Sequence, residues 1–269
     1  MKKLVFLLLL SIATWSSHAA SFDHADFDHA AWDQLLKKHV ISINQGVATQ
    51  VDYRGFSRDR FKLKSYLRSL ESLSKATFNH WPKQQQLAFL INAYNAWTVE
   101  LILTEYPELE SIKDLGSWIK SPWDRRFIPL LGSTHSLDEI EHGMIRADGV
   151  YQEPRIHFAV NCASIGCPAL AGVAFTADKL DAQLDQVTRN FLSDRSRNYL
   201  AGETLNISKI FKWYRNDFER GWGGYQKLHQ FLSAYQTSLD LSDHDIQRLK
   251  NGDIEIVFLD YNWKLNDKR

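Results

Sequence analysis

The sequence predicts an α+β fold, with one helix-rich domain around a small antiparallel sheet. Helical periodicity dominates the first half of the chain, while short strand patterns, some paired as hairpins, come later between further helices. The 269 residues are 44% hydrophobic and 24% charged, an ordinary globular composition that excludes a disordered or fibrous protein. No repeat and no Pro-, Gly- or Ser-rich linker divides the chain, so we expect a single domain over residues 20–269.

Residues 1–19 have the pattern of a secretory signal peptide. Lys2 and Lys3 precede an apolar run over residues 4–12, and small residues lead up to an expected cleavage site after Ala19. This run is shorter than the roughly 20 residues that span a bilayer, so we expect no stable membrane insertion after cleavage. The mature protein is therefore expected to be periplasmic or secreted.

The helical pattern is strongest over residues 83–105, and looser helical faces lie over 32–40 and 61–70. The strongest helix is apolar on nearly all sides, which predicts that it is buried. Asn92 and Asn95 lie inside it. Because an unpaired buried amide costs about 1–3 kcal/mol, we expect both side chains either to bind neighbouring loops or to form the polar lining of a site.

Strand patterns predict two hairpins, one over 127–131 and 134–136 and one over 199–200 and 204–207. Residues 155–161 alternate between polar and apolar side chains, and residues 254–259 form a last strand pattern. Further helices are expected from Leu137, from Ala177 and from Gly224, with a shorter one near Asp243.

The helix from Leu137 begins with a capping box, formed by Ser136 and Glu139. Glu141 falls within its apolar arc, and a carboxylate that faces the core must be paired or take up a proton with a raised pKa. We expect Glu141 either to form an ion pair, with Arg155 as a candidate partner, or to orient a catalytic group. His142 lies on the polar side, where a surface position or a supporting role is expected.

Residues 155–168 form the densest cluster of chemically useful side chains. Strand alternation would place Arg155, His157 and Asn161 on one face and send Cys162 to the other. A Cys162 thiolate could reach an imidazole only if the strand ends near Asn161 and the following turn redirects the chain.

Three interpretations of Cys162 and Cys167 compete. An oxidising compartment favours a structural disulfide between them. A second interpretation makes Cys162 a nucleophile, which excludes a disulfide at rest unless that bond is reducible. A third is a redox couple, against which the four-residue spacer argues.

Several tryptophans lie beside polar groups and suit either contact with sugar rings or peptides or simply the core, namely Trp118, Trp123, Trp213 and Trp222. Tyr214, next to Trp213, is expected to bind with it. We expect no metal and no cofactor, because no pair of histidines has the spacing of a helical metalloprotease site. The 32 basic and 32 acidic residues give no sign of a nucleic-acid partner.

Four ordered motifs resemble an uncharacterised family shared by bacteria and plants, the domain of unknown function 547 family. The resemblance extends from about Trp32 to Tyr235, and its motifs are Phe89-Leu90-Ile91-Asn92-Ala93-Tyr94-Asn95-Ala96, Ser136-Leu137 with Ile140-Glu141-His142, Arg155-Ile156-His157-Phe158 with Asn161-Cys162 and Cys167-Pro168, and Trp213-Tyr214 with Asp217-Phe218. The resemblance implies no settled activity. A relation to papain-like or transglutaminase-like enzymes is a fold-level analogy, and the motif order departs from their usual Cys, His, Asp order.

The leading hypothesis is thiol-dependent hydrolysis or acyl transfer on a peptide or cell-wall amide. In it Cys162 is the nucleophile, His157 the base and Glu141 the orienting group, and Asn92 or Asn95 is the oxyanion donor. The expected binding residues are His142, Arg155, Asn161, Trp213 and Tyr214. The alternative is a non-catalytic periplasmic binding or scaffold module with a structural Cys162–Cys167 disulfide, which contacts a peptide, glycan or partner protein.

Overall fold

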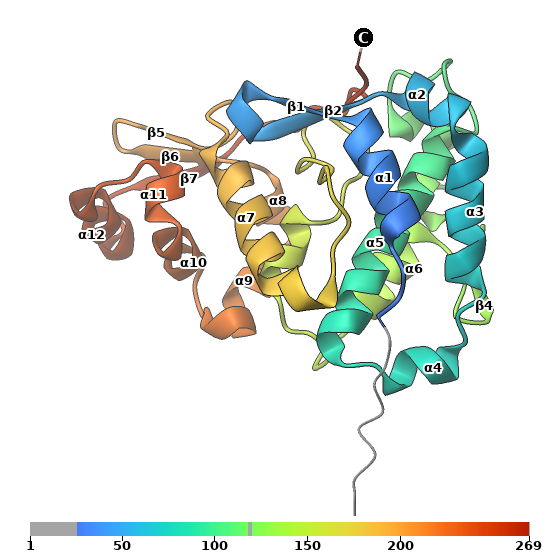
Figure 1. Ribbon diagram of the computed structural model, residues 1–269. Helices are drawn as coiled ribbons and strands as arrows, with labels where there is room; N and C mark the ends of the chain where they lie inside the picture. Colours follow the sequence, from blue (N-terminus) through green and yellow to red (C-terminus); the bar gives the residue numbers. More distant parts are fainter. Residues whose placement is uncertain (1–25, 118–119, 269) are drawn as a thin grey trace, which may run out of the picture.

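The computed structural model describes residues 26–117 and 120–268, and the expected signal peptide lies outside them. The α+β prediction is confirmed, because helices surround three small sheets (Figure 1). The helices are α1 (Ala30–His39), α2 (Tyr53–Arg58), α3 (Arg60–Glu71), α4 (Lys75–His80), α5 (Lys83–Ile102), α6 (Leu137–Ile140), α7 (Leu180–Ser193), α8 (Ile210–Trp213), α9 (Arg215–Glu219), α10 (Leu228–Ala234), α11 (Gln236–Leu239) and α12 (Asp243–Asn251). No helix within the described ranges has the length and apolar character needed to cross a bilayer.

The strands are β1 (Val40–Ile43), β2 (Ala48–Val51), β3 (Ile128–Leu130), β4 (Ser133–His135), β5 (Tyr199–Ala201), β6 (Thr204–Ile207) and β7 (Glu255–Phe258). Both expected hairpins are confirmed as the antiparallel pairs β3–β4 and β5–β6. The last strand, β7, pairs with β6 in parallel, so this third sheet is mixed. The β1–β2 hairpin was not anticipated, because Val40 also continues the apolar face of α1.

Helix α5 is the centre of the larger cluster of buried residues, and it packs against α3 and α6. The expected burial is confirmed: Leu90 is 1% exposed and Ile91 is fully buried. No charged residue lies between Lys83 and Glu100, so every face of the helix can meet apolar neighbours.

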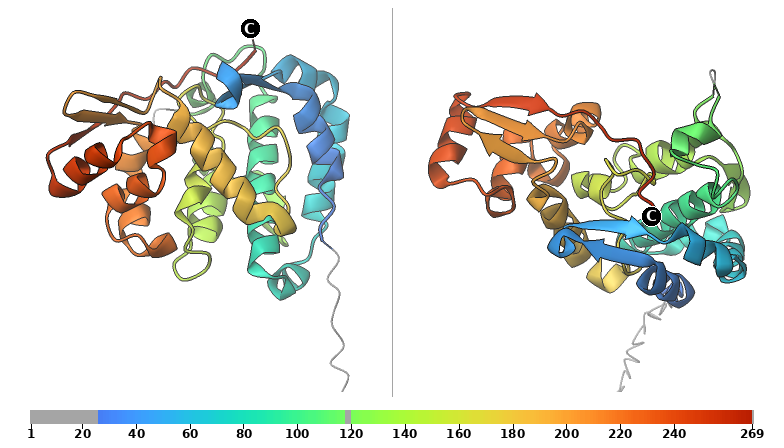
Figure 2. Two further views of the ribbon diagram at one scale, coloured as in Figure 1. Left: turned by 60° about the vertical axis from the view of Figure 1, so that its left-hand side comes forward. Right: turned by 90° about the horizontal axis from the view of Figure 1, so that it is seen from above.

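A second cluster of buried residues lies under the C-terminal helices and the β5–β7 sheet, which stand together on one side of the molecule (Figure 2). Phe158 belongs to this second cluster, whereas Ile156 and Ala159 belong to the first. The segment around residues 154–168 therefore runs between the two clusters, and its polar residues His157, Asn161 and Ser164 are buried.

The strand expected over residues 155–161 is wrong. Residues Pro154–Phe158 form a 3-10 helix, which begins at a proline and is capped by the Glu153 side chain accepting from the Arg155 backbone N–H. Proline is favoured in the first turn of a helix because its missing N–H would be unpaired there. Ile156, His157 and Phe158 are all buried, since the chain has one cluster on each side.

The other expected helices are present with shifted bounds. The helix from Ala177 begins as a 3-10 turn and continues as α7, and the helix near Asp243 is α12. The helix expected from Gly224 begins four residues later as α10, because Gly223 and Gly224 have φ angles of 58° and 86°. Such left-handed conformations interrupt a right-handed helix.

Candidate functional site

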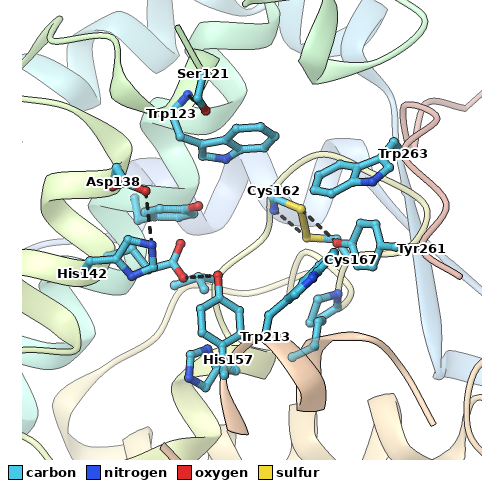
Figure 3. Close-up of a pocket in the computed structure, with 16 residues that line it drawn as sticks. Ser121, Trp123, Asp138, His142, His157, Cys162, Cys167, Trp213, Tyr261 and Trp263 are labelled. Atoms are coloured by element: carbon cyan, nitrogen blue, oxygen red, sulfur yellow. Dashed lines mark hydrogen bonds and ion pairs between the residues drawn. A yellow bond between two sulfur atoms is a disulfide. The ribbon is translucent and has the colours of Figure 1, made fainter. Parts of the chain in front are cut away.

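A cavity of about 250 Å³ opens where α5, α6, α8, the 154–168 segment and the C-terminal segment meet (Figure 3). Seven of the residues singled out from the sequence line it, namely Glu141, His142, His157, Cys162, Cys167, Trp213 and Tyr214. Further lining residues are Tyr94, Ser121, Trp123, Asp138, Val160, Pro168, Ile210, Tyr261 and Trp263. Asn92, Asn95, Arg155 and Asn161 are not part of this lining.

Glu141 faces the cavity because the helix changes geometry at this residue. Helix α6 ends at Ile140 and continues as a π-helical turn over Glu141–Ile145, a local widening that often occurs at functional sites. Glu141 is 6% exposed, and the hydroxyl of Tyr214 donates to its Oε1 at 2.9 Å. Burial, and then the charge of Glu141, raises the pKa of Tyr214.

The expected ion pair between Glu141 and Arg155 is wrong. Arg155 instead pairs with Glu153 at 2.6 Å and with Asp181 at 2.7 Å. The partner of Glu141 is therefore a phenol rather than a guanidinium. Sequence pattern placed Glu141 toward the core correctly, but only the tertiary structure brings Tyr214, at the C-terminal end of α8 and 73 residues later in the chain, against it.

His157 lies beneath the ring of Tyr214, with the two ring centroids 4.0 Å apart. Its Nε2 is 2.7 Å from Oδ2 of Asp217. Burial lowers the pKa of His157, despite the raising effect of Asp217, so the neutral ring donates from Nε2 to the carboxylate. Its Nδ1 is buried and has no hydrogen-bond partner among the residues that the structure describes.

Asp217 is the shared partner of several side chains under the cavity. Arg146 donates to the same Oδ2 at 2.6 Å, and Arg220 lies 2.7 Å from Oδ1. Burial alone would raise the pKa of Asp217, but His157 and Arg146 outweigh it and hold this pKa at about 2. From the sequence, Asp217 is identified only as a motif residue. Its place beside Phe218 in the short helix α9 carried no signal of a partner 60 residues away.

Cys162 and Cys167 are joined as a disulfide on the cavity wall. The chain turns sharply after Cys162, where Ala163 has a φ of 61°. The Cys162 sulfur lies 3.1 Å from the Tyr261 hydroxyl and 3.3 Å from the Ser164 hydroxyl. In the described part of the chain no imidazole nitrogen is hydrogen-bonded to it. Of the three interpretations of the cysteine pair, the structure supports the disulfide.

Asn161 holds this loop closed rather than facing the cavity. Its Oδ1 accepts from the backbone N–H of Ala163 at 2.9 Å, and its Nδ2 donates to the carbonyl of Pro168 at 2.7 Å. Because both ends of the amide are occupied, Asn161 fixes the loop that contains the disulfide.

Asn92 and Asn95 also bind backbone groups of neighbouring loops. Asn92 donates to the carbonyl of Phe175 at 2.7 Å and accepts from its N–H at 3.0 Å. Asn95 donates to the carbonyl of Ala159 at 2.9 Å and accepts from the N–H of Asn161 at 2.8 Å. Both amides are thus paired at each end, which is the first of the two alternatives that the sequence left open for them.

His142 lies at the edge of the cavity, with its side chain 37% exposed. Its Nε2 is 3.2 Å from Oδ1 of Asp138, and its Nδ1 contacts the guanidinium of Arg146. Burial raises the pKa of Asp138 against the opposing effect of His142, and Asp124 and Glu141 raise it further. Glu141 therefore disfavours the charged form of Asp138, which belongs to the same cavity lining.

Aromatic rings form the wall of the cavity across from Asp138 and His142 (Figure 3). The ring centroids of Tyr261 and Trp263 are 4.5 Å apart, those of Trp213 and Tyr261 are 4.8 Å apart, and those of Trp123 and Trp263 are 5.8 Å apart. Of the tryptophans named from the sequence, Trp123 and Trp213 line the cavity, and Trp118 lies outside the described residues. Tyr261 and Trp263 were missed, since they lie in a loop without any periodic pattern. Within the described ranges, no group of three or more histidine, cysteine, aspartate or glutamate side chains could hold a metal ion.

Comparison with known proteins gives one match. The model of a family described as "Protein of unknown function, DUF547" matches residues 78–192. This range contains α5, Glu141, His157 and both cysteines, but not Trp213, Asp217 or the C-terminal aromatic residues. No curated protein and no solved structure matches the chain.

Proposed function

The chain belongs to the DUF547 family, which brings no known activity with it, and we therefore propose from the cavity itself that this is an exported ligand-binding protein. In this proposal the aromatic cavity beside the disulfide binds a small molecule or one end of a peptide or glycan. The cavity, at about 250 Å³, is slightly smaller than the roughly 300–1,000 Å³ of typical ligand sites, which suits a small group or a chain end.

One observation carries the proposal: the state of the Cys162 sulfur. It is bonded to Cys167, and its other close neighbours are the hydroxyls of Tyr261 and Ser164 rather than an imidazole. A thiol becomes a strong nucleophile when a nearby base or positive charge lowers its pKa. Neither group contacts this sulfur, whereas the surrounding walls are rich in aromatic surface suited to recognition.

Titration of thiols tests this proposal. Native protein is expected to present no reactive thiol before reduction and two after it, since Cys162 and Cys167 are the two cysteines of the chain. The Cys167→Ser variant then exposes Cys162 alone, and its reaction rate with a thiol reagent is expected to follow an ordinary pKa of about 8.5. A single fast thiol that reacts below pH 7 would contradict the proposal.

Thiol-dependent hydrolysis is the second candidate, favoured by the presence of Cys162, His157 and Glu141 in the lining of one cavity. The carboxylate that holds the imidazole in this case is Asp217, as in a catalytic triad. Such chemistry requires prior reduction of the disulfide. Adding His157→Ala to the Cys167→Ser background separates the candidates: the thiol rate falls strongly if the imidazole is a base, and stays unchanged if the cavity only binds.

Export is part of the same proposal. A disulfide persists in oxidising compartments and is rare in the cytosol, so the Cys162–Cys167 bond fits the expected signal peptide. Fractionation of the producing cells, with N-terminal sequencing of the mature protein, tests this. A chain that begins at Ala20 outside the cytoplasm is expected, and an intact Met1 in the cytosol would contradict export.

A further inference from the structure

The charged residues of the described cavity lining are acidic rather than basic. Asp138 and Glu141 are its acidic residues, and the described lining contains no lysine and no arginine. The two histidines in the lining, His142 and His157, add positive charge only when protonated, and burial keeps His157 neutral. The described lining therefore contains acidic residues without a lysine or arginine to balance them.

Glu141 is a buried carboxylate that forms no ion pair with a cationic side chain of the described residues. Among the described residues, the contacts to its carboxylate come from tyrosine hydroxyls, with Tyr214 donating at 2.9 Å, and no lysine, arginine or histidine forms an ion pair with it. An ionised carboxylate that is removed from water without a counter-charge is costly. A cation inside the cavity would supply that charge.

The lining that contains this carboxylate also contains a wall of π surfaces. Trp213, Tyr261 and Trp263 are in mutual contact, and Trp213 remains 45% exposed at the cavity mouth. The same cluster already attracts a cation on its outer side, where the ammonium of Lys113 lies 3.7 Å from the centroid of the Trp263 ring. Aromatic faces attract cations through their quadrupole, and alkylated ammonium ions are the ligands that aromatic cages take best.

We propose that this cavity binds a small organic cation with an alkylated ammonium group, its charge toward Glu141 and its alkyl groups against Trp213, Tyr261 and Trp263. This inference rests on the proposed binding function and gives it a ligand class. A primary ammonium suits the site less well, because it brings three N–H donors into a wall that offers mainly ring faces.

Choline and 3,3-dimethylbutan-1-ol test the proposal, because the two molecules share a shape and differ in charge. Binding to the oxidised mature protein is followed by calorimetry and by tryptophan fluorescence. Choline is expected to bind about tenfold more tightly than the neutral alcohol. Phosphocholine, measured in the same way, shows which kind of molecule supplies the ammonium group. Tighter binding than that of choline indicates a headgroup that carries phosphate, and weaker binding indicates a free cation.

Two variants locate the interaction. Glu141→Gln is expected to weaken choline binding about tenfold while leaving the alcohol unaffected, since the amide keeps the size and loses the charge. Glu255→Gln, an exposed glutamate on β7, is the matched control and should change neither affinity. Trp213→Leu should also weaken choline binding, whereas Phe61→Leu, at a 68% exposed side chain on α3, should not.

Equal binding of choline and the alcohol would overturn the cation inference and leave the proposed binding function intact. Absence of choline binding would overturn it as well, as would an unchanged choline affinity in a folded Glu141→Gln protein. The proposed function fails separately, through a fast low-pKa thiol in the titration described above.

Discussion

Replacement of Asp217 by asparagine removes the charge that holds the network under the cavity together. Asp217 is 1% exposed and contacts His157, Arg146 and Arg220. The variant keeps the shape of the side chain but removes the carboxylate that Arg146 and Arg220 share, while Arg220 keeps its exposed partner Asp148. Breaking a buried ion pair in this way typically costs about 3–5 kcal/mol.

The pKa of Asp217 gives an independent magnitude. In the folded protein it is held at about 2, against an ordinary value of 3.8. At about 1.4 kcal/mol per pH unit, this difference corresponds to about 2 kcal/mol of stability at neutral pH. Because the folded-state pKa is lowered, that stability is present above about pH 4 and is lost as the pH falls through about 2.

Urea denaturation of wild type and Asp217→Asn at pH 7, 4 and 2.5 measures both quantities. We expect the free energy of unfolding of the variant to be at least about 2 kcal/mol below that of wild type at pH 7. We expect this difference to shrink as the pH falls toward 2. Asp185→Asn is the control, because Asp185 pairs with Arg189 on the surface, where such pairs contribute less than about 1 kcal/mol. A difference in the free energy of unfolding below about 1 kcal/mol at pH 7, or one that stays constant down to pH 2.5, would refute the reasoning.

Three further changes have expected outcomes in the same assay, each given as a loss in the free energy of unfolding. Asn95→Ala should cost about 1–3 kcal/mol, because it leaves the buried backbone groups of Ala159 and Asn161 unpaired; a cost near zero would mean that water replaces the amide. Reduction of the disulfide, or Cys167→Ser, should cost about 2 kcal/mol, since the bond closes a loop of only five residues' separation; an unchanged midpoint after reduction would indicate two free thiols in the native protein. Ser136→Ala should cost about 1 kcal/mol by removing the cap that accepts from the Glu139 N–H at 3.0 Å, and Ser133→Ala, on the exposed β4 strand, should cost little by comparison.

Features with a strong local pattern could be predicted from the sequence. The buried helix α5, the capping box of Ser136 and the inward position of Glu141 each follow from periodicity over one turn or more. The same patterns could not identify the hydrogen-bond partners of these side chains, because the bond from Tyr214 to Glu141 joins residues that are 73 positions apart.

The segment around His157 shows why pattern alone fails elsewhere. Its alternation of polar and apolar residues is that of a strand, but Pro154 and the Glu153 cap begin a 3-10 helix. Polar side chains there are buried because they find partners across the chain, as His157 does in Asp217. Tyr261 and Trp263 lie in a loop, where no period distinguishes a cavity wall from an ordinary exposed aromatic residue.

The indole N–H resonances of the uniformly ¹⁵N-labelled protein, titrated with choline, test the central claim most directly. Trp123, Trp213 and Trp263 line the cavity, whereas Trp32 is fully buried in the larger core cluster and serves as an internal reference. We expect saturable shifts of the three cavity indoles and none of Trp32. The Trp213 signal is identified by its absence from the Trp213→Leu spectrum, and Glu141→Gln is expected to weaken the choline-induced shifts. Shifts spread evenly over all indoles, or none up to concentrations at which the neutral alcohol binds, would contradict the account.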